Sequence, residues 1–273
     1  MSDPTTFTVE HDGVLLDGEE AGTGSPVLLL HGLTATRRYV VHGSRAVERA
    51  GHRVVSYDAR GHGVSSPAPD PAHYTYDRMI ADAVAVLDAL GIKRAAVVGQ
   101  SMGSATALGL ALRHPERVSS LVVITPAHRG RPSSPQALER WDRLAAAFEA
   151  GGPEGFVGAL NFSMDERFRD TVRTVVAQRM ARHEHRAAIV DCLRMIPRSA
   201  AFDGLDALAG VRAPTLLVGS RDSSDPDHPL AVAQEYERRI PDVRLVVEDE
   251  GQSPLAWRGG TLSKEIIAHI DAA

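Results

Sequence analysis

The chain has 273 residues and a formal net charge of −5 at pH 7, and 43% of its residues are hydrophobic and 24% are charged. This length suits one large α/β domain with an insertion, and this composition is ordinary for a globular protein. The negative charge gives no electrostatic reason to expect a nucleic acid or an anionic membrane as partner, and the apolar runs are far shorter than the ~20 residues of a membrane span. With Cys192 as the single cysteine and no visible secretory signal, the expected compartment is a reducing cytoplasm.

Strand and helix signals alternate along the first half of the chain. Two short strands at 7–10 and 14–16 are expected to form a hairpin turned at Asp12-Gly13, a dipeptide that favours such turns. Continuous apolar runs predict further buried strands, and apolar residues at helical spacing, ending near glycine or proline, predict helices. The expected strands are 27–30, 54–57, 95–98 and 118–124, and the expected helices are 44–50, 77–90 and 105–113.

This alternation stops at Pro126 and resumes after about Gly210. The stretch between them shows only helical patterns, at 135–150, 153–160, 165–182 and 184–195. Strands at 214–218 and 243–247 and helices at 230–240 and 262–270 follow. Strands alternating with helices imply a mostly parallel, doubly wound sheet. We therefore expect an α/β core of residues 1–125 and 211–273, with a helical lid of residues 126–210 inserted between the sixth and seventh strands.

The pentapeptide Gly99-Gln100-Ser101-Met102-Gly103 is the most informative motif. It lies between a buried-strand pattern and a helix pattern, which is the context that a G-x-S-x-G nucleophile elbow requires. Its two glycines allow a sharp turn and a close approach of neighbouring backbone. Ser101 would then lie at a helix N-terminus, where free N–H groups and the helix dipole favour developing negative charge.

Four motifs at the ends of predicted strands make the chain resemble the α/β-hydrolase fold, specifically its small cofactor-free esterases, lactonases and C–C-bond hydrolases. They are His31-Gly32-Leu33, 58–63, 99–103 and Gly219-Ser220-Arg221-Asp222. The resemblance covers nearly the whole chain and implies a triad in the order serine, acid, histidine. It also implies a lid between the sixth and seventh strands and no cofactor. No residue pattern indicates a metal or nucleotide site.

The resemblance assigns roles to particular residues. Ser101 would be the nucleophile, and the backbone N–H groups of Met102 and Leu33 would form the oxyanion hole. His31, Gly32 and Gln100 would lie at the substrate, with the side chain of His31 mainly shaping its loop. Asp222 is the favoured triad acid because of its spacing after Gly219, and Asp225 is its competitor, interpreted as a turn residue before Pro226.

Gln252 stands where the resemblance places the catalytic histidine. A glutamine amide can accept a hydrogen bond but cannot take up a proton near neutral pH, so this position cannot supply a general base. The chain is therefore expected to be a serine hydrolase scaffold that is inactive or severely impaired. Three explanations stay open: an engineered histidine-to-glutamine trapping variant, which is preferred; a natural non-hydrolytic member; or another histidine, such as His228, acting as the base.

The expected substrate is a small carboxylic ester or lactone, bound between the elbow and the lid. Arginines of the lid, including Arg129 and Arg131, could meet a carboxylate or phosphate of the substrate, although exposed arginines are more often solvated. Hydrolysis of a C–C bond in a vinylogous diketone, a haloperoxidase-like activity, and a ligand-binding or lyase-like relative are the alternatives. A serine at position 101 argues against dehalogenases and epoxide hydrolases. The sequence leaves a homodimer open.

Overall fold

The computed structural model describes residues 3–160, 166–222, 225, 227–253 and 255–273. Eight strands of this described part form one sheet in the order β1-β2-β4-β3-β5-β6-β7-β8. β1 (Thr5–His11) and β2 (Val14–Ala21) form the predicted hairpin, and β2 also runs antiparallel to β4 (Arg53–Tyr57). The remaining neighbours are parallel; they are β3 (Pro26–Leu30), β5 (Ala95–Gln100), β6 (Val118–Ile124), β7 (Thr215–Gly219) and β8 (Val243–Val247).

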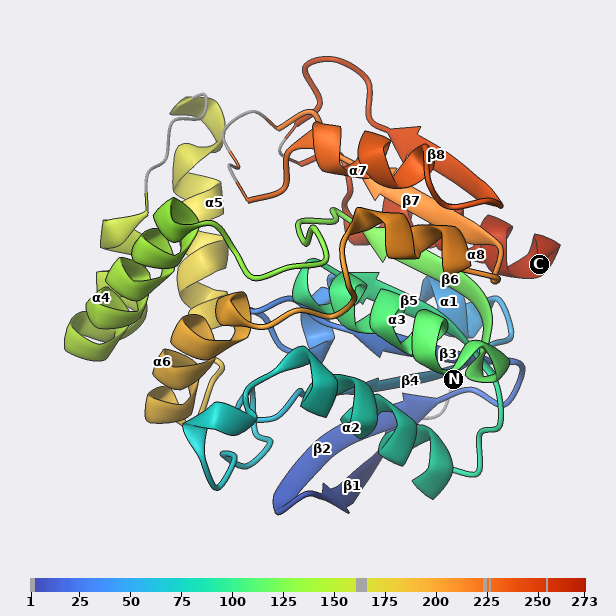
Figure 1. Cartoon of the computed structure of the whole chain (residues 1–273), viewed down its shortest axis with the longest axis horizontal. Coiled ribbons are helices and arrows are strands. Elements are labelled where there is room, and N and C mark those ends of the chain that lie inside the picture. The colour runs from blue at the N-terminus through green and yellow to red at the C-terminus, as the bar shows by residue number, and fades with distance from the viewer. Residues whose placement is uncertain (1–2, 161–165, 223–224, 226, 254) are drawn as a thin grey trace.

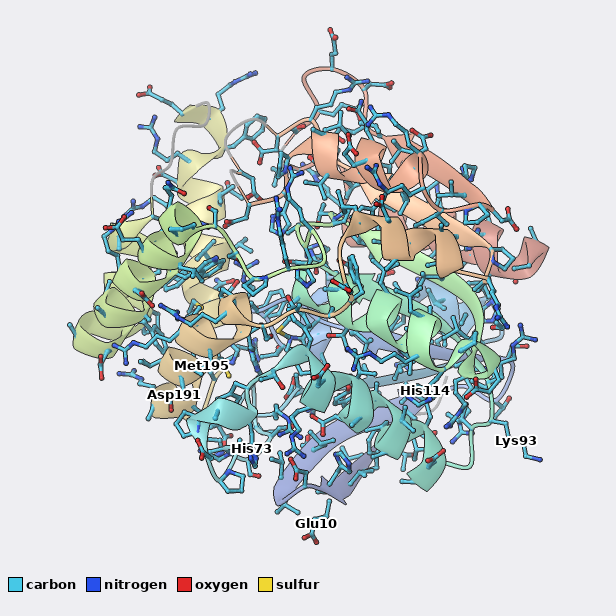
Figure 2. All side chains as sticks on the ribbon, in the orientation of Figure 1. Glu10, His73, Lys93, His114, Asp191 and Met195 are labelled. Carbon is cyan, nitrogen blue, oxygen red and sulfur yellow. The ribbon has the colours of Figure 1, made fainter. Side chains whose placement is uncertain are left out.

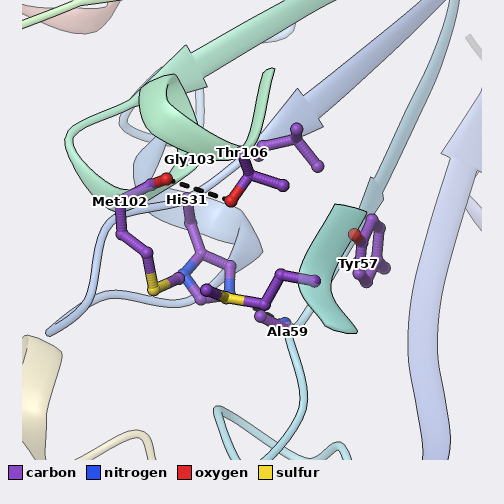
Figure 3. Close-up of a pocket in the computed structure, with 8 residues that line it drawn as sticks. His31, Tyr57, Ala59, Met102, Gly103 and Thr106 are labelled. Carbon is purple, nitrogen blue, oxygen red and sulfur yellow. Dashed lines mark hydrogen bonds between the residues drawn. The ribbon is translucent and has the colours of Figure 1, made fainter. Parts of the chain in front are cut away.

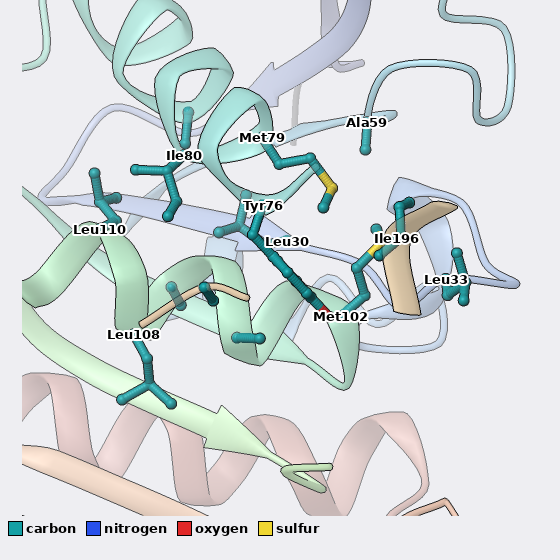
Figure 4. Close-up of a cluster of buried hydrophobic side chains, with 14 of the residues drawn as sticks. Leu30, Leu33, Ala59, Tyr76, Met79, Ile80, Met102, Leu108, Leu110 and Ile196 are labelled. Atoms are coloured by element: carbon teal, nitrogen blue, oxygen red, sulfur yellow. The ribbon is translucent and has the colours of Figure 1, made fainter. Parts of the chain in front are cut away.

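Helices cover both faces of this sheet, which confirms the predicted doubly wound α/β fold (Figure 1). Side chains of β3 alternate between the faces, because Leu28 and Leu30 belong to one buried cluster and Val27 and Leu29 to the other. The first cluster includes residues of α2 (Tyr76–Ala89), α3 (Met102–Arg113) and α7 (Leu230–Glu237); the second includes residues of α1 (Ala46–Arg49) and α8 (Gly259–Ala272). Figure 4 shows part of the first cluster, where Tyr76 and Ile80 lie near Leu108 and Leu110.

The helices between β6 and β7 stand together beside the sheet (Figure 1). They are α4 (Pro135–Ala159), α5 (Glu166–Met180) and α6 (Arg186–Met195), and α4 contacts both α5 and α6. α4 is broken at Gly152, which has a φ of 60° and precedes Pro153, so the two helices predicted on either side of this point are present. Phe148 packs edge-on against Phe156 across the break. That these helices act as a lid stays a prediction.

Glu10 and Lys93, which are exposed, lie at the periphery of the fold (Figure 2), whereas Arg60 and Asp82 are buried and form an ion pair. Among the helices of the described residues, none combines the length and the apolar character that crossing a membrane would need. α1 is shorter than predicted: the expected helix at 44–50 is reduced to four residues, although its Val47 is buried as expected of a core-facing position.

Candidate active site

The turn between β5 and α3 presents Ser101 in a conformation that non-glycine residues rarely adopt, with φ 54° and ψ −112°. Its N–H donates to the carbonyl of Ile124 at 3.0 Å, which fixes the turn against β6. A Cβ at Gly99 would lie 2.1 Å from the carbonyl oxygen of Gly103, and a Cβ at Gly103 would lie 2.1 Å from that of Leu30. Glycine is therefore required at both positions, as in a nucleophile elbow.

His228 is the side chain that the structure places against Ser101. Its Nε2 lies 2.7 Å from the Ser101 Oγ, and its Nδ1 lies 2.7 Å from Oδ2 of Asp225. A carboxylate can only accept, so the Nδ1–H donates to Asp225 and the free Nε2 lone pair accepts the Ser101 hydroxyl proton. This tautomer is the one that a general base for serine needs.

The environment of this pair favours an ionised acid beside a basic imidazole. Burial raises the pKa of Asp225, but the His228 charge and hydrogen bond outweigh it, and the pKa falls to about 2. Burial lowers the pKa of His228, yet the charge of Asp225, its hydrogen bond and the charge of Asp227 outweigh it, so the net shift is upward. The charge of Arg179 opposes that rise. The result is a neutral-pH base whose protonated form Asp225 stabilises.

This arrangement corrects two assignments made from the sequence. The side chain that contacts Ser101 is His228 rather than that of residue 252, and the carboxylate on this imidazole is Asp225 rather than Asp222. Gln252 is exposed in a turn, where its N–H donates to the carbonyl of Asp249. Asp222 is half-buried and helps to form the turn that leads to Asp225, whose N–H donates to the Asp222 carbonyl at 3.3 Å.

A local sequence signal for His228 existed. Asp225 and His228 are three residues apart in a loop that follows a buried strand and ends at Pro229, just before α7. That spacing lets the carboxylate meet the imidazole within one turn of chain. The family resemblance instead places the histidine after the last strand, where this chain has Gln252.

The loop after β3, which contains Gly32 and Leu33, lies beside Ser101. A Cβ at Gly32 would lie 3.4 Å from the Ser101 Cβ and 3.9 Å from its Oγ, and also 3.5 Å from the Gln100 carbonyl oxygen, so Gly32 and Gln100 adjoin Ser101. Within the described part of the chain, the N–H groups of Leu33 and Met102 donate to no backbone carbonyl in a turn, loop or cap. The Met102 N–H belongs to the first turn of α3, where amides lack helical partners.

His31 holds the loop from behind rather than acting as a base. The N–H of Ala59 donates to its Nε2 at 2.9 Å, so its Nδ1–H donates to the Gly32 carbonyl at 2.8 Å. Burial and the nearby His62 lower the pKa of His31 to about 3, which keeps it neutral. His62 lies against the same loop, with its Nε2 2.8 Å from the Leu33 carbonyl. These contacts fix the direction of the peptides beside Ser101.

A small cavity lies behind the elbow, lined by residues that include His31, Met102 and Thr106 (Figure 3). Its volume of about 10 Å³ suits about one water molecule, so it is not a substrate site. A larger hollow near Arg113 and Arg131 is lined by neither Ser101 nor His228. Within the described residues, no group of three or more His, Cys, Asp or Glu side chains is arranged to hold a metal ion.

Comparison with known proteins places this site in a family. Residues 25–205 match the alpha/beta hydrolase fold family. The chain belongs to the α/β-hydrolase fold family. It is 30% identical over 232 residues to a putative carbamate hydrolase RutD of Azorhizobium caulinodans, covering 84% of each protein. It is 39% identical over 120 residues to a 2-hydroxymuconate semialdehyde hydrolase of a Pseudomonas strain, covering 42% of this chain and 41% of that protein.

A solved structure of similar shape is the thermophilic esterase of Thermogutta terrifontis, with a TM-score of 0.72 and 26% identity over 90% of each chain. Together with the sequence relatives, it supports a general hydrolase activity for this chain. The matched family region ends at residue 205, before the loop that carries Asp225 and His228. The two residues that differ from the expected triad positions therefore lie in the part of this hydrolase that the family match does not cover.

Proposed function

We propose that this hydrolase is a working serine hydrolase of small carboxylic esters or lactones, with Ser101 as nucleophile, His228 as general base and Asp225 as the acid that orients it. The observation that carries the proposal is the pair of 2.7 Å contacts joining Ser101, His228 and Asp225. With His228 in this place, the glutamine at position 252 does not disable the site.

The mechanism follows from these contacts. Ser101 Oγ attacks the substrate carbonyl carbon while its proton passes to His228 Nε2, and Asp225 stabilises the imidazolium that forms. The carbonyl electrons move onto oxygen, and the N–H groups of Leu33 and Met102 would stabilise that oxyanion. His228 then gives its proton to the leaving alkoxide, which leaves an acyl group on Ser101. The same imidazole next deprotonates water, which attacks the acyl group and regenerates the serine.

Arg179, in the last turn of α5, refines the substrate class. Its Nε is buried and has no hydrogen-bond partner among the described residues. Its charge opposes the upward shift of the His228 pKa and interacts with Asp225, so the guanidinium lies near the acid and the imidazole of the site. Arg129 and Arg131, by contrast, are exposed. Arg179 is half-buried, and the charge of Asp225 favours its charged form. Because its buried Nε still lacks an acceptor, we assign the substrate a carboxylate that pairs with Arg179.

The first experiment measures hydrolysis of p-nitrophenyl butyrate by the unaltered chain, Ser101→Ala and His228→Gln, with intact-mass spectra of each. The unaltered chain should turn over, and both variants should lose about 10⁴- to 10⁶-fold in kcat/KM, because each removes a member of the triad. Equal activity in His228→Gln would contradict the assignment of the base.

A second experiment tests the anionic substrate with a matched pair of esters, p-nitrophenyl butyrate and the p-nitrophenyl monoester of succinic acid. Arg179→Gln should lower kcat/KM for the anionic ester by about 10- to 100-fold relative to the neutral one, which is the effect expected of a lost charged hydrogen bond. Arg182→Gln, at an exposed arginine just beyond α5, is the control and should leave the ratio unchanged. An unchanged ratio in Arg179→Gln would refute the carboxylate assignment.

C–C-bond hydrolysis of a vinylogous diketone is the second candidate. The similarity to a 2-hydroxymuconate semialdehyde hydrolase favours it, and Arg179 is compatible with an acidic diketone. Comparison of kcat/KM for the two substrates distinguishes the candidates, because a C–C hydrolase would have a higher kcat/KM for such a diketone than for the succinate monoester.

A further inference from the structure

Glu248, immediately after β8, is a buried carboxylate that the chemistry above does not use; only 5% of the residue is exposed. One of its oxygens, Oε1, accepts from the Ser220 hydroxyl at 2.8 Å, from the Arg221 N–H at 2.7 Å and from the Ser253 hydroxyl. The Glu248 carbonyl accepts from the Arg221 Nε at 2.9 Å. A buried carboxylate with three donors on one oxygen is a fixed structural centre.

From this centre, hydrogen bonds between described residues lead to the nucleophile. The Ser220 Oγ that donates to Glu248 also accepts from the N–H of Asp222 at 3.2 Å. The Asp222 carbonyl accepts from the N–H of Asp225 at 3.3 Å. The Asp225 carboxylate then holds His228, and His228 contacts Ser101. The contacts among Ser220, Asp222, Asp225 and His228 lie within the loop after β7, and the contacts of Glu248 join the start of that loop to the end of β8.

We propose that Glu248 is a positioning residue for catalysis: it anchors the start of the loop after β7, so that Asp225 and His228 meet Ser101 in the productive geometry. This inference rests on the proposed function of His228. The physical reason is that a loop has no ladder of its own to hold it, and a displacement of about 1 Å at a catalytic group can cost about 100-fold in rate.

A second contact restrains the far end of the same loop. Arg140 of α4 pairs with Asp227, next to His228. The loop is therefore held at its start by Glu248 and near its end by the helical insertion. Removing one anchor should loosen the geometry without emptying the site, so the expected effect is on turnover more than on binding.

The test compares Glu248→Ala, Glu248→Gln and Ser220→Ala. Glu248→Ala should lower kcat about 10- to 100-fold with little change in KM, because the loop loses its anchor while the substrate contacts stay. Glu248→Gln keeps a carbonyl oxygen for the three donors and should recover most of the rate. Ser220→Ala breaks one link and should give a smaller loss. Glu250→Ala, an exposed glutamate two residues further on, is the control and should match the unaltered chain.

A readout independent of turnover separates this inference from the proposed function. NMR titration follows the His228 imidazole, assigned by its absence in His228→Gln. In Glu248→Ala its pKa should fall, because contact with Asp225 is weakened while burial persists. Failure of Ser101 and His228 variants to lose activity would overturn the proposed function. An unchanged His228 titration and a kcat within threefold of the unaltered chain, in folded Glu248→Ala, would overturn the role of Glu248 alone. If Glu248→Ala does not fold, Ser220→Ala decides by the same two readouts.

Discussion

The loops after β7 and β8 divide the work of the site unequally. The loop after β7 carries both the acid and the base, Asp225 and His228, which are three residues apart. The loop after β8 carries Glu248, which binds the start of the other loop, Ser253, which donates to Glu248, and the exposed Gln252. Trp257 adds a further link, since its Nε1–H donates to the Gly219 carbonyl at 2.8 Å. In the proposed mechanism, one loop therefore performs proton transfer and the other holds it in place.

This division indicates that the fold constrains the position of the nucleophile more strictly than it constrains which loop carries the base. Ser101 is confined by close backbone contacts at Gly99 and Gly103, which leave one backbone path. An imidazole, in contrast, can reach the serine oxygen from any loop at the carboxyl edge of the sheet. The following four predictions test the division, from the largest expected effect to the smallest.

A histidine introduced at position 252 should not replace His228 as the base. The double variant His228→Gln/Gln252→His should stay about 10⁴- to 10⁶-fold below the unaltered chain in kcat/KM, because a histidine at the exposed position 252 does not meet Ser101. Gln252→His alone should keep its activity within about threefold. Ester hydrolysis kinetics measure both. Recovery in the double variant would show that the loop after β8 can supply the base and would contradict the proposed division between the two loops.

The two aspartates of the loop after β7 should differ strongly. Asp225→Asn should lower kcat about 10³- to 10⁴-fold, because the amide no longer holds the required tautomer of His228. Asp222→Asn should cost less than about tenfold, since its backbone carbonyl supplies the described contact with Asp225. Steady-state kinetics of both, with melting temperatures as the folding control, decide the order. Equal losses would contradict the assigned acid.

The acid limb of the pH profile should reflect the raised pKa of His228. Burial lowers that pKa, but Asp225 raises it by more, so kcat/KM should fall as the pH drops through an apparent pKa above the ordinary value of histidine. Activity should be lost toward low pH because the neutral imidazole is the active form of the base and protonation removes it. In Asp225→Asn the limb should move to lower pH, because the favourable charge is gone. A limb that moves upward instead would be inconsistent with this pair.

Ser253→Ala should affect stability more than chemistry. Its hydroxyl donates to Glu248, so its loss should lower the free energy of unfolding by about 1 kcal/mol while turnover changes by less than about threefold. Urea unfolding and ester kinetics on one preparation measure the two effects. A large loss of turnover at unchanged stability would place Ser253 among the catalytic groups.

Much of the fold could be predicted from the sequence because its signals are local. The buried strands are continuous apolar runs, the hairpin turns at Asp12-Gly13 with both φ values positive, and the break in α4 falls at Gly152-Pro153. Ser101 could be found for the same reason, since a strand, two glycines and a helix surround it within a few residues.

The base could not be placed in the same way, because its contact with Ser101 joins residues 127 positions apart. Which histidine reaches the serine depends on the path of the loop after β7, which contacts Glu248 at its start and Arg140 near its end, and neither contact has a local sequence signal. The substrate class, the lid role of residues 126–210 and the impairment expected from Gln252 stay predictions, and the geometry of His228 argues against the last.

The short separation of Asp225 and His228 has a consequence for inheritance and engineering. In a triad whose acid and base come from different loops, a change in either loop length disturbs their alignment. Here the acid and the base are close together along the chain, so a length change elsewhere alters their distance from Ser101 rather than their separation in sequence. Transfer of this pair to another nucleophile elbow would therefore require one loop together with the contacts that Glu248 and Arg140 make to it.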